Sequence, residues 1–171
     1  AELKMADMFD ICHGGGLDLC ALGLAEIDAM GNVNVSKFHG RVTGPGGFID
    51  LAQHTKKLIL MGTFTAGGLR EHCEGGRLVI DREGKYQKFK TDIEQVTFSG
   101  DYAAAHGQHV LVVTERAVFR LTPQGLMLTE IAPGVDLERD ILGQMEFRPL
   151  IADDLQLMDG RIFQPDPMGL S

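Results

Sequence analysis

Several signatures of common protein classes are missing from this 171-residue chain. No apolar run reaches the roughly 18 residues that would cross a membrane, and no secretory signal is visible. The three cysteines, Cys12, Cys20 and Cys73, form no CxxC pair, which argues against a zinc ribbon or a redox dithiol. Because scattered thiols fit a reducing compartment, we expect a cytoplasmic protein that does not bind membranes.

Nucleotide-binding and metal-binding motifs are missing as well. The run Gly14-Gly15-Gly16 lacks GxGxxG spacing, no GxxxxGK[ST] loop is present, and the six histidines form no HExxH pair. The net charge of -8 argues against a nucleic-acid groove, which needs clustered Lys and Arg. We therefore expect no metal site, no permanently bound cofactor and no nucleic-acid partner.

What the chain does contain predicts one α/β domain over residues 1–171. Apolar segments begin residues 17–28 and fill residues 58–65 and 109–114, as in strands that are buried on both faces of a parallel sheet. A length of 171 residues is enough for one domain with its own core. The expected fold class is therefore a mixed, largely parallel sheet with flanking helices.

Turn signals divide the second half of the chain. Alternating segments flank residues 82–85 and residues 122–125, and both patterns predict a β-hairpin, the second more clearly and towards the C-terminus. Asp136 is a candidate N-cap for a helix whose apolar residues recur every four positions. From Leu150 onward the sequence predicts a less regular tail.

One loop could carry chemistry. Gly44-Pro45-Gly46-Gly47-Phe48 precedes a short predicted helix over residues 48–53. Pro45 has no N–H, so the backbone donors available to an anion lie at Gly46, Gly47 and Phe48. Two adjacent N–H groups are a common way to stabilise the oxyanion of an acyl transfer. By pattern alone, a purely structural turn remains the alternative.

Four segments together resemble one known family. They are GGGLDLCALGLAEIDAMGNVNVSKF, VTGPGGFIDLAQHTKK, VTERAVFRL and LTEIAPGVDLERDI. In this order they resemble the family I coenzyme A transferases of the acetate or short-chain acyl-CoA:3-ketoacid type, in which α-like and β-like halves are fused. The resemblance covers residues 9–163 and implies the C-terminal part of the β-like half, with the CoA-transferase (NagB/RpiA-like) fold.

The resemblance also implies a reaction. Family members move CoA between carboxylic acids: a glutamate attacks the acyl-CoA thioester, and an acyl–glutamyl anhydride and then a glutamyl-CoA thioester follow. Carried over to this chain, the oxyanion-hole N–H groups fall on Gly47 and Phe48, and Gly46, Gly47 and Phe48 would contact the CoA substrate. The implied partners are an acyl-CoA, a short-chain carboxylic acid, the rest of the enzyme and further copies of it, in ketone-body or short-chain fatty-acid metabolism.

The family's nucleophile is missing from this sequence. No ESG or ENG occurs, and Glu74-Gly75-Gly76 follows the glycine loop instead of preceding it. We expect the glutamate to lie upstream of Ala1, and this chain to be inactive alone. The alternative is a catalytically inactive module that binds CoA or assembles a subunit.

Overall fold

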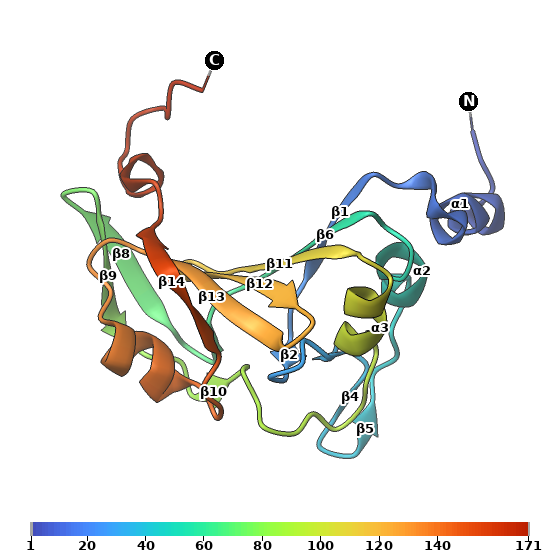
Figure 1. Cartoon of the computed structure of the whole chain (residues 1–171), viewed down its shortest axis with the longest axis horizontal. Coiled ribbons are helices and arrows are strands. Elements are labelled where there is room, and N and C mark those ends of the chain that lie inside the picture. Colours follow the sequence, from blue (N-terminus) through green and yellow to red (C-terminus); the bar gives the residue numbers. More distant parts are fainter. Residues whose placement is uncertain (1, 171) are drawn as a thin grey trace.

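The computed structural model describes residues 2–170 and centres on a six-stranded mixed β-sheet (Figure 1). In spatial order its strands are β1 (Leu19–Gly23), β6 (Lys57–Met61), β11 (His109–Val113), β12 (Ala117–Thr122), β13 (Gly125–Ile131) and β14 (Leu150–Leu157). The pairs β1–β6, β6–β11 and β13–β14 are parallel, whereas β11–β12 and β12–β13 are antiparallel. The predicted fold class is confirmed.

Two long crossovers connect the first three strands. Between β1 and β6 lie β2 (Glu26–Ile27), β3 (Val33–Asn34), β4 (Lys37–Phe38), β5 (Arg41–Val42) and helix α2 (Phe48–Ala52). Between β6 and β11 lie β7 (Thr65–Ala66), β8 (Arg70–Glu74), β9 (Arg77–Arg82), β10 (Tyr86–Gln87) and α3 (Gly100–Ala105). The remaining helices are α1 (Met5–Ile11), η1 (Cys12–Gly16), η2 (Leu137–Ile141), η3 (Leu142–Gln144) and η4 (Gly160–Phe163). None of the helices in residues 2–170 is long and apolar enough to cross a membrane.

The core lies against one face of the sheet. Alternate residues of β6 and β11, such as Leu58 and Val112, are fully buried on this face. Three phenylalanines fill its centre: the ring of Phe89 lies 4.5 Å from that of Phe64 and 5.0 Å from that of Phe119. Such stacked and tilted rings combine a large buried area with favourable ring–ring geometry.

The opposite face of the sheet is only partly covered, which corrects the expectation that the strands are buried on both faces. Leu19, Met61 and Leu111 on this outer face are 56%, 49% and 37% exposed. Strand β1 is an edge strand that has a hydrogen-bonded neighbour only at β6. An edge position cannot be recognised from an apolar segment, because the segment does not reveal what lies beside it.

Two other expectations were wrong. Residues 82–85 do not close a hairpin, because β9 pairs with β8 across the positive-φ turn at Gly75 and Gly76, while β10 pairs with β7. The tail is also more regular than expected, since β14 adds a parallel strand beside β13. The register between these strands shifts between Leu128 and Glu130, and a shifted register obscures a strict alternation pattern.

The hairpin at residues 122–125 is confirmed. Gly125 has φ 113°, and a Cβ there would lie 2.5 Å from the carbonyl oxygen of Ala29, so both backbone conformation and space require glycine. Asp136 caps the following helix by accepting the N–H of Arg139 at 2.8 Å. That helix is a π turn followed by a 3-10 turn instead of a regular α-helix.

Candidate functional site

The glycine loop forms a tight turn at the start of α2. The N–H of Phe48 donates to the carbonyl oxygen of Pro45 at 3.1 Å. Gly46 has φ 55° and Gly47 has φ -85° and ψ 8°. These angles fit a type II′ turn, in which the second residue needs a positive φ and is therefore usually glycine.

The three predicted donors differ in their availability. Within residues 2–170, the N–H groups of Gly46 and Gly47 have no hydrogen-bond acceptor, whereas the N–H of Phe48 is used by Pro45. The Phe48 ring is buried and packs in the core, which anchors the end of the turn. The turn therefore presents two backbone N–H groups without a partner and a third that closes the turn.

Access to the turn is one-sided. Nothing lies within 4 Å of the position that a Cβ on Gly46 would take. A Cβ on Gly47 would instead lie 2.9 Å from two ring carbons of Phe9, which belongs to α1. The sequence predicts open space at both glycines, but only Gly46 is open. The contact with Phe9 could not be found from sequence, because it depends on how α1 packs on α2.

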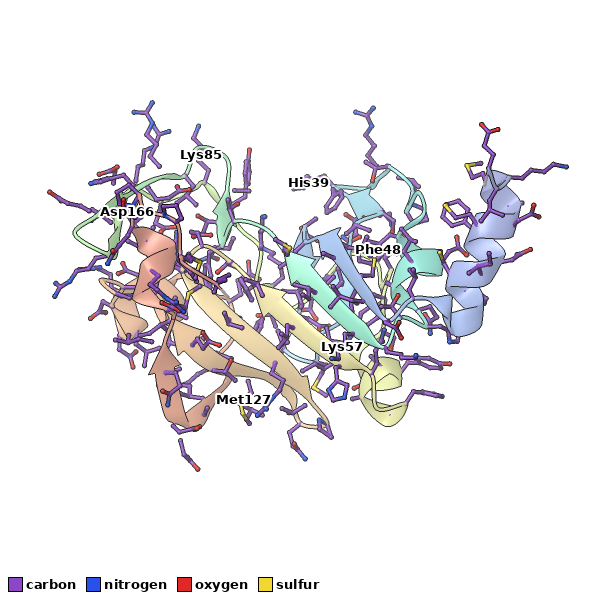
Figure 2. All side chains as sticks on the ribbon, turned by 90° about the horizontal axis from the view of Figure 1, so that it is seen from above. His39, Phe48, Lys57, Lys85, Met127 and Asp166 are labelled. Carbon is purple, nitrogen blue, oxygen red and sulfur yellow. The ribbon has the colours of Figure 1, made fainter. Side chains whose placement is uncertain are left out.

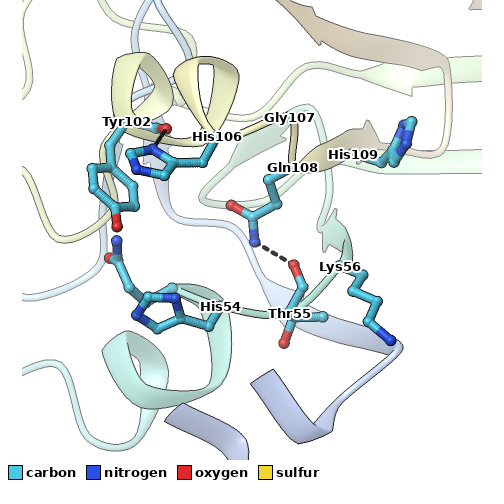
Figure 3. A pocket seen from close by; sticks show the side chains of 9 residues that line it. His54, Thr55, Lys56, Tyr102, His106, Gly107, Gln108 and His109 are labelled. Carbon is cyan, nitrogen blue, oxygen red and sulfur yellow. Dashed lines mark hydrogen bonds between the residues drawn. The ribbon is translucent and has the colours of Figure 1, made fainter. Parts of the chain in front are cut away.

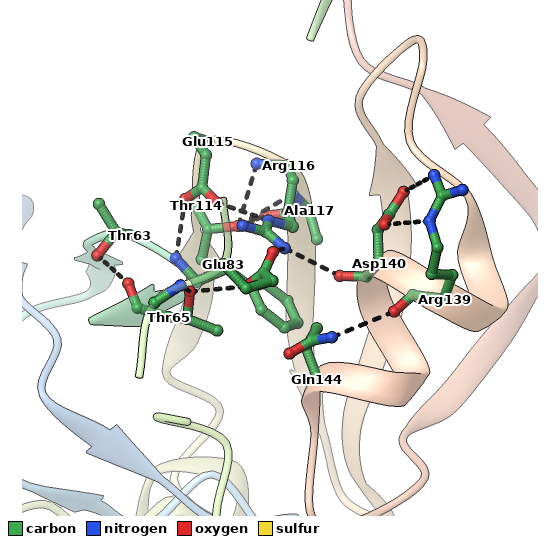
Figure 4. Close-up of polar contacts among 12 residues, drawn as sticks. Thr63, Thr65, Glu83, Thr114, Glu115, Arg116, Ala117, Arg139, Asp140 and Gln144 are labelled. Carbon is green, nitrogen blue, oxygen red and sulfur yellow. Dashed lines mark hydrogen bonds and ion pairs between the residues drawn. The ribbon is translucent and has the colours of Figure 1, made fainter. Parts of the chain in front are cut away.

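A buried arginine organises the loops at the carboxyl ends of β6 and β11 (Figure 4). The Arg116 side chain is fully buried; its Nε donates to Glu115 at 2.6 Å, and its Nη1 pairs with Glu83 and donates to the carbonyl oxygen of Asp140. The two carboxylates extend the network, since Glu115 accepts the N–H of Phe64 and Glu83 accepts the hydroxyl of Thr65. Sequence reasoning missed this network.

The histidines outside this region gather at the opposite ends of the strands (Figure 3). His54, His106 and His109 line a cavity of about 230 Å³ near the starts of β6 and β11. Gln108 holds this region together, since its Nε2 donates to the carbonyl oxygens of Ala52 and Thr55. No group of His, Cys, Asp and Glu in the described part of the chain could hold a metal ion.

Comparisons with known proteins place this geometry in a family, although no family model matches the sequence. The chain is 50% identical over 169 residues to the acetate CoA-transferase YdiF of Escherichia coli, covering 99% of the chain and 32% of YdiF. The crystal structure of the YdiF apoenzyme superposes on the whole chain with a TM-score of 0.97. The chain is a homologue of the CoA-transferases.

Other relatives refine this relation. The β subunit of the Escherichia coli acetate CoA-transferase is 31% identical over 161 residues, which cover 94% of this chain and 64% of the subunit. The caffeate CoA-transferase of Acetobacterium woodii is 47% identical, with 33% of its length covered. The decarboxylase AibA/AibB, at 19% identity and a TM-score of 0.67, shares the fold alone. The chain thus spans about a third of the first relatives' length and corresponds to a β-like part of these enzymes.

Proposed function

We propose that this chain forms the β-like part of a CoA-transferase that moves CoA between a short-chain acyl-CoA and a carboxylic acid. The 50% identity to acetate CoA-transferase YdiF over nearly the whole chain carries this proposal. A crystal structure of YdiF in a thioester complex with CoA also matches the chain, with a TM-score of 0.97. CoA is accordingly a substrate and not a resident cofactor.

The glycine turn supplies the electrostatic half of the mechanism. A glutamate carboxylate from outside residues 1–171 attacks the thioester carbon, and the carbonyl oxygen becomes an oxyanion. The N–H of Gly47, which has no acceptor, donates to it; the N–H of Phe48 joins by exchanging the Pro45 carbonyl for the oxyanion. Gly46 leaves the approach open, and Phe9 closes the far side of the turn.

The covalent steps then follow from the carboxylate's chemistry. Collapse of the tetrahedral intermediate breaks the C–S bond, which yields an acyl–glutamyl anhydride and CoA thiolate. The thiolate attacks the glutamyl carbonyl, forms glutamyl-CoA and releases the first acid. A second acid reverses these steps and leaves with CoA.

The outer face of the sheet supports a role within a larger assembly. Exposed apolar side chains such as Leu19 and Met61 offer a surface to the remainder of the enzyme, as one polypeptide or as separate subunits. We further propose a cytoplasmic homo-oligomer that acts in short-chain fatty-acid or ketone-body metabolism. On its own, the 171-residue chain should self-associate in sedimentation experiments; a clean monomer would contradict this use of the outer face.

The transfer proposal is tested by removing one N–H. Gly47→Pro and Gly47→Ala both add atoms against Phe9, but only proline removes the donor. In a Phe9→Ala background, which relieves the clash, we expect the proline variant of the complete protein to lose about 10² to 10³ in kcat relative to the alanine variant. Mass spectrometry of acyl-CoA exchange with labelled acetate provides the measurement.

Three outcomes are distinguishable. Equal rates in the two variants, with native circular dichroism, would exclude the Gly47 N–H from catalysis. Absence of exchange in the unmodified complete protein would overturn the transferase proposal itself. Binding of acyl-CoA without exchange would instead support the catalytically inactive binding or assembly module.

A further inference from the structure

A large open cavity of about 710 Å³ lies where β1 ends and is lined from three directions. Residues 24–26 follow β1, Phe38 and His39 belong to the β4–β5 hairpin, and residues 84–88 surround β10. Figure 2 shows His39 and Lys85 towards one side of the molecule and Lys57, at the start of β6, towards the other. In α/β sheets, ligands bind outside the carboxyl ends of the strands, which is where this cavity lies.

Lys88 provides a cation in the wall of this cavity that is only partly satisfied. Its Nζ donates to the carbonyl oxygen of Leu24 at 3.2 Å and makes no ion pair within residues 2–170. An ammonium has three protons to donate, so donors remain for a ligand. Partial burial lowers the pKa of Lys88, against the opposing influence of Glu115, because the charged form loses hydration. An anionic ligand would replace that lost solvation.

The surroundings keep room for this ammonium. A Cβ on Gly62 would lie 3.1 Å from both the Lys88 Nζ and the Leu24 carbonyl oxygen, so a larger residue there would crowd the contact. Exposed Lys85 adds a second cation without an ion pair, whereas Lys90 is already paired with Glu146. Two free cations give the cavity a positive potential in a chain whose net charge is -8.

His39 forms part of the rim in an unusual conformation. It has φ 51° and is the non-glycine residue with a positive φ in the described part of the chain. The next residue holds it there, since the Gly40 N–H donates to Glu94 at 2.7 Å and Glu94 also pairs with Lys37. Such conformations cost energy and cluster at ligand-binding sites.

The size of the cavity selects the class of ligand. Acetate is far smaller than about 710 Å³, a volume that falls within the range for cofactor-sized molecules. We propose that the cavity binds the phosphate-bearing nucleotide portion of a coenzyme A ligand, with Lys88 inside and Lys85 and His39 at the rim. This assignment rests on the proposed transferase function, but concerns a place separate from the glycine turn.

Binding of 3′-phosphoadenosine 5′-phosphate, the nucleotide portion of CoA, provides the direct test. In calorimetric titrations of the complete protein, Lys88→Met should weaken binding about 10-fold to 100-fold, as expected for losing a charge-assisted hydrogen bond. Lys57→Met removes an exposed lysine on the far side and should leave the Kd unchanged. Equal Kd values for the wild type and Lys88→Met would overturn the assignment. Competition by acetate but not by inorganic phosphate would also overturn it, in favour of a carboxylate site.

A second measurement avoids the risk that a variant misfolds. N-acetoxysuccinimide acetylates accessible amines of the unmodified protein, and peptide mass spectrometry reports each lysine. The nucleotide should slow acetylation of Lys88 and leave that of Lys57 unchanged; equal slowing, or none, would contradict the assignment. Nucleotide protection in a protein without exchange activity would refute the transferase function and keep the cavity. Exchange with an unchanged KM for CoA in Lys88→Met would do the reverse.

Discussion

Replacement of the buried Arg116 by methionine should destabilise the protein strongly. Arg116 is fully buried, and it pairs with Glu115 and Glu83, whose side chains are only 16% and 28% exposed. Methionine fills similar volume but leaves both carboxylates without their cation and the carbonyl oxygen of Asp140 without its donor. The main loss is therefore electrostatic and does not come from a cavity.

The expected magnitude follows from the burial of the network. Removing one partner of a buried ion pair costs about 3–5 kcal/mol, because the remaining charge is left uncompensated. For a domain of this size, each kcal/mol corresponds to roughly 2–4 °C in Tm. Arg116→Met should therefore lower Tm by about 6–20 °C. Lysine keeps the charge but cannot bridge three acceptors, so Arg116→Lys should fall between the two.

Thermal unfolding followed by circular dichroism measures the effect. Arg148→Met serves as the matched control, because Arg148 and Glu138 form an exposed pair at 3.5 Å, worth at most about 1 kcal/mol. A triple variant, Arg116→Met with Glu83→Gln and Glu115→Gln, should recover part of the loss by removing the unpaired charges. A Tm within about one degree of wild type for Arg116→Met would refute the reasoning.

Two further predictions concern the core and the pH dependence of stability. Phe89→Ala removes the ring between Phe64 and Phe119 and should cost about 3–5 kcal/mol in urea unfolding, whereas a loss below 1 kcal/mol would mean that the aromatic cluster collapses into the space. The hydrogen bond from Arg139 lowers the pKa of Asp140, so its contribution to stability is present above the unfolded-state pKa of about 3.9 and is lost as the pH falls through the lower folded-state pKa. Asp140→Asn should therefore lose less stability than wild type between about pH 5 and pH 3, and parallel unfolding curves would contradict this assignment.

The sequence predicted the elements whose signals are local. The apolar residues of 58–65 and 109–114 led to β6 and β11, and the Pro-Gln-Gly turn led to the β12–β13 hairpin. Strand β14 escaped prediction because exposed Asp153 and Asp154 interrupt its apolar residues near a shift in register. The short β8 was missed because all of its side chains are exposed, so no buried face marks it.

The candidate site divides in the same way. The glycine turn was predictable because Gly46 and Gly47 follow one another next to proline. The contact of Phe9 with the turn and the complete burial of Arg116 were not predictable, because each depends on the packing of segments that are distant in the sequence. The turn thus entered as a set of spare backbone donors and became a one-sided site only in the folded chain.

Locating a covalent CoA adduct tests the central claim most directly. The complete protein is mixed with an acyl-CoA without any acceptor acid, digested, and searched by mass spectrometry for a peptide carrying CoA. The account predicts a CoA thioester on a glutamate outside the 171 residues of this chain. An adduct on a glutamate within them, or exchange activity with no adduct at any time, would contradict it.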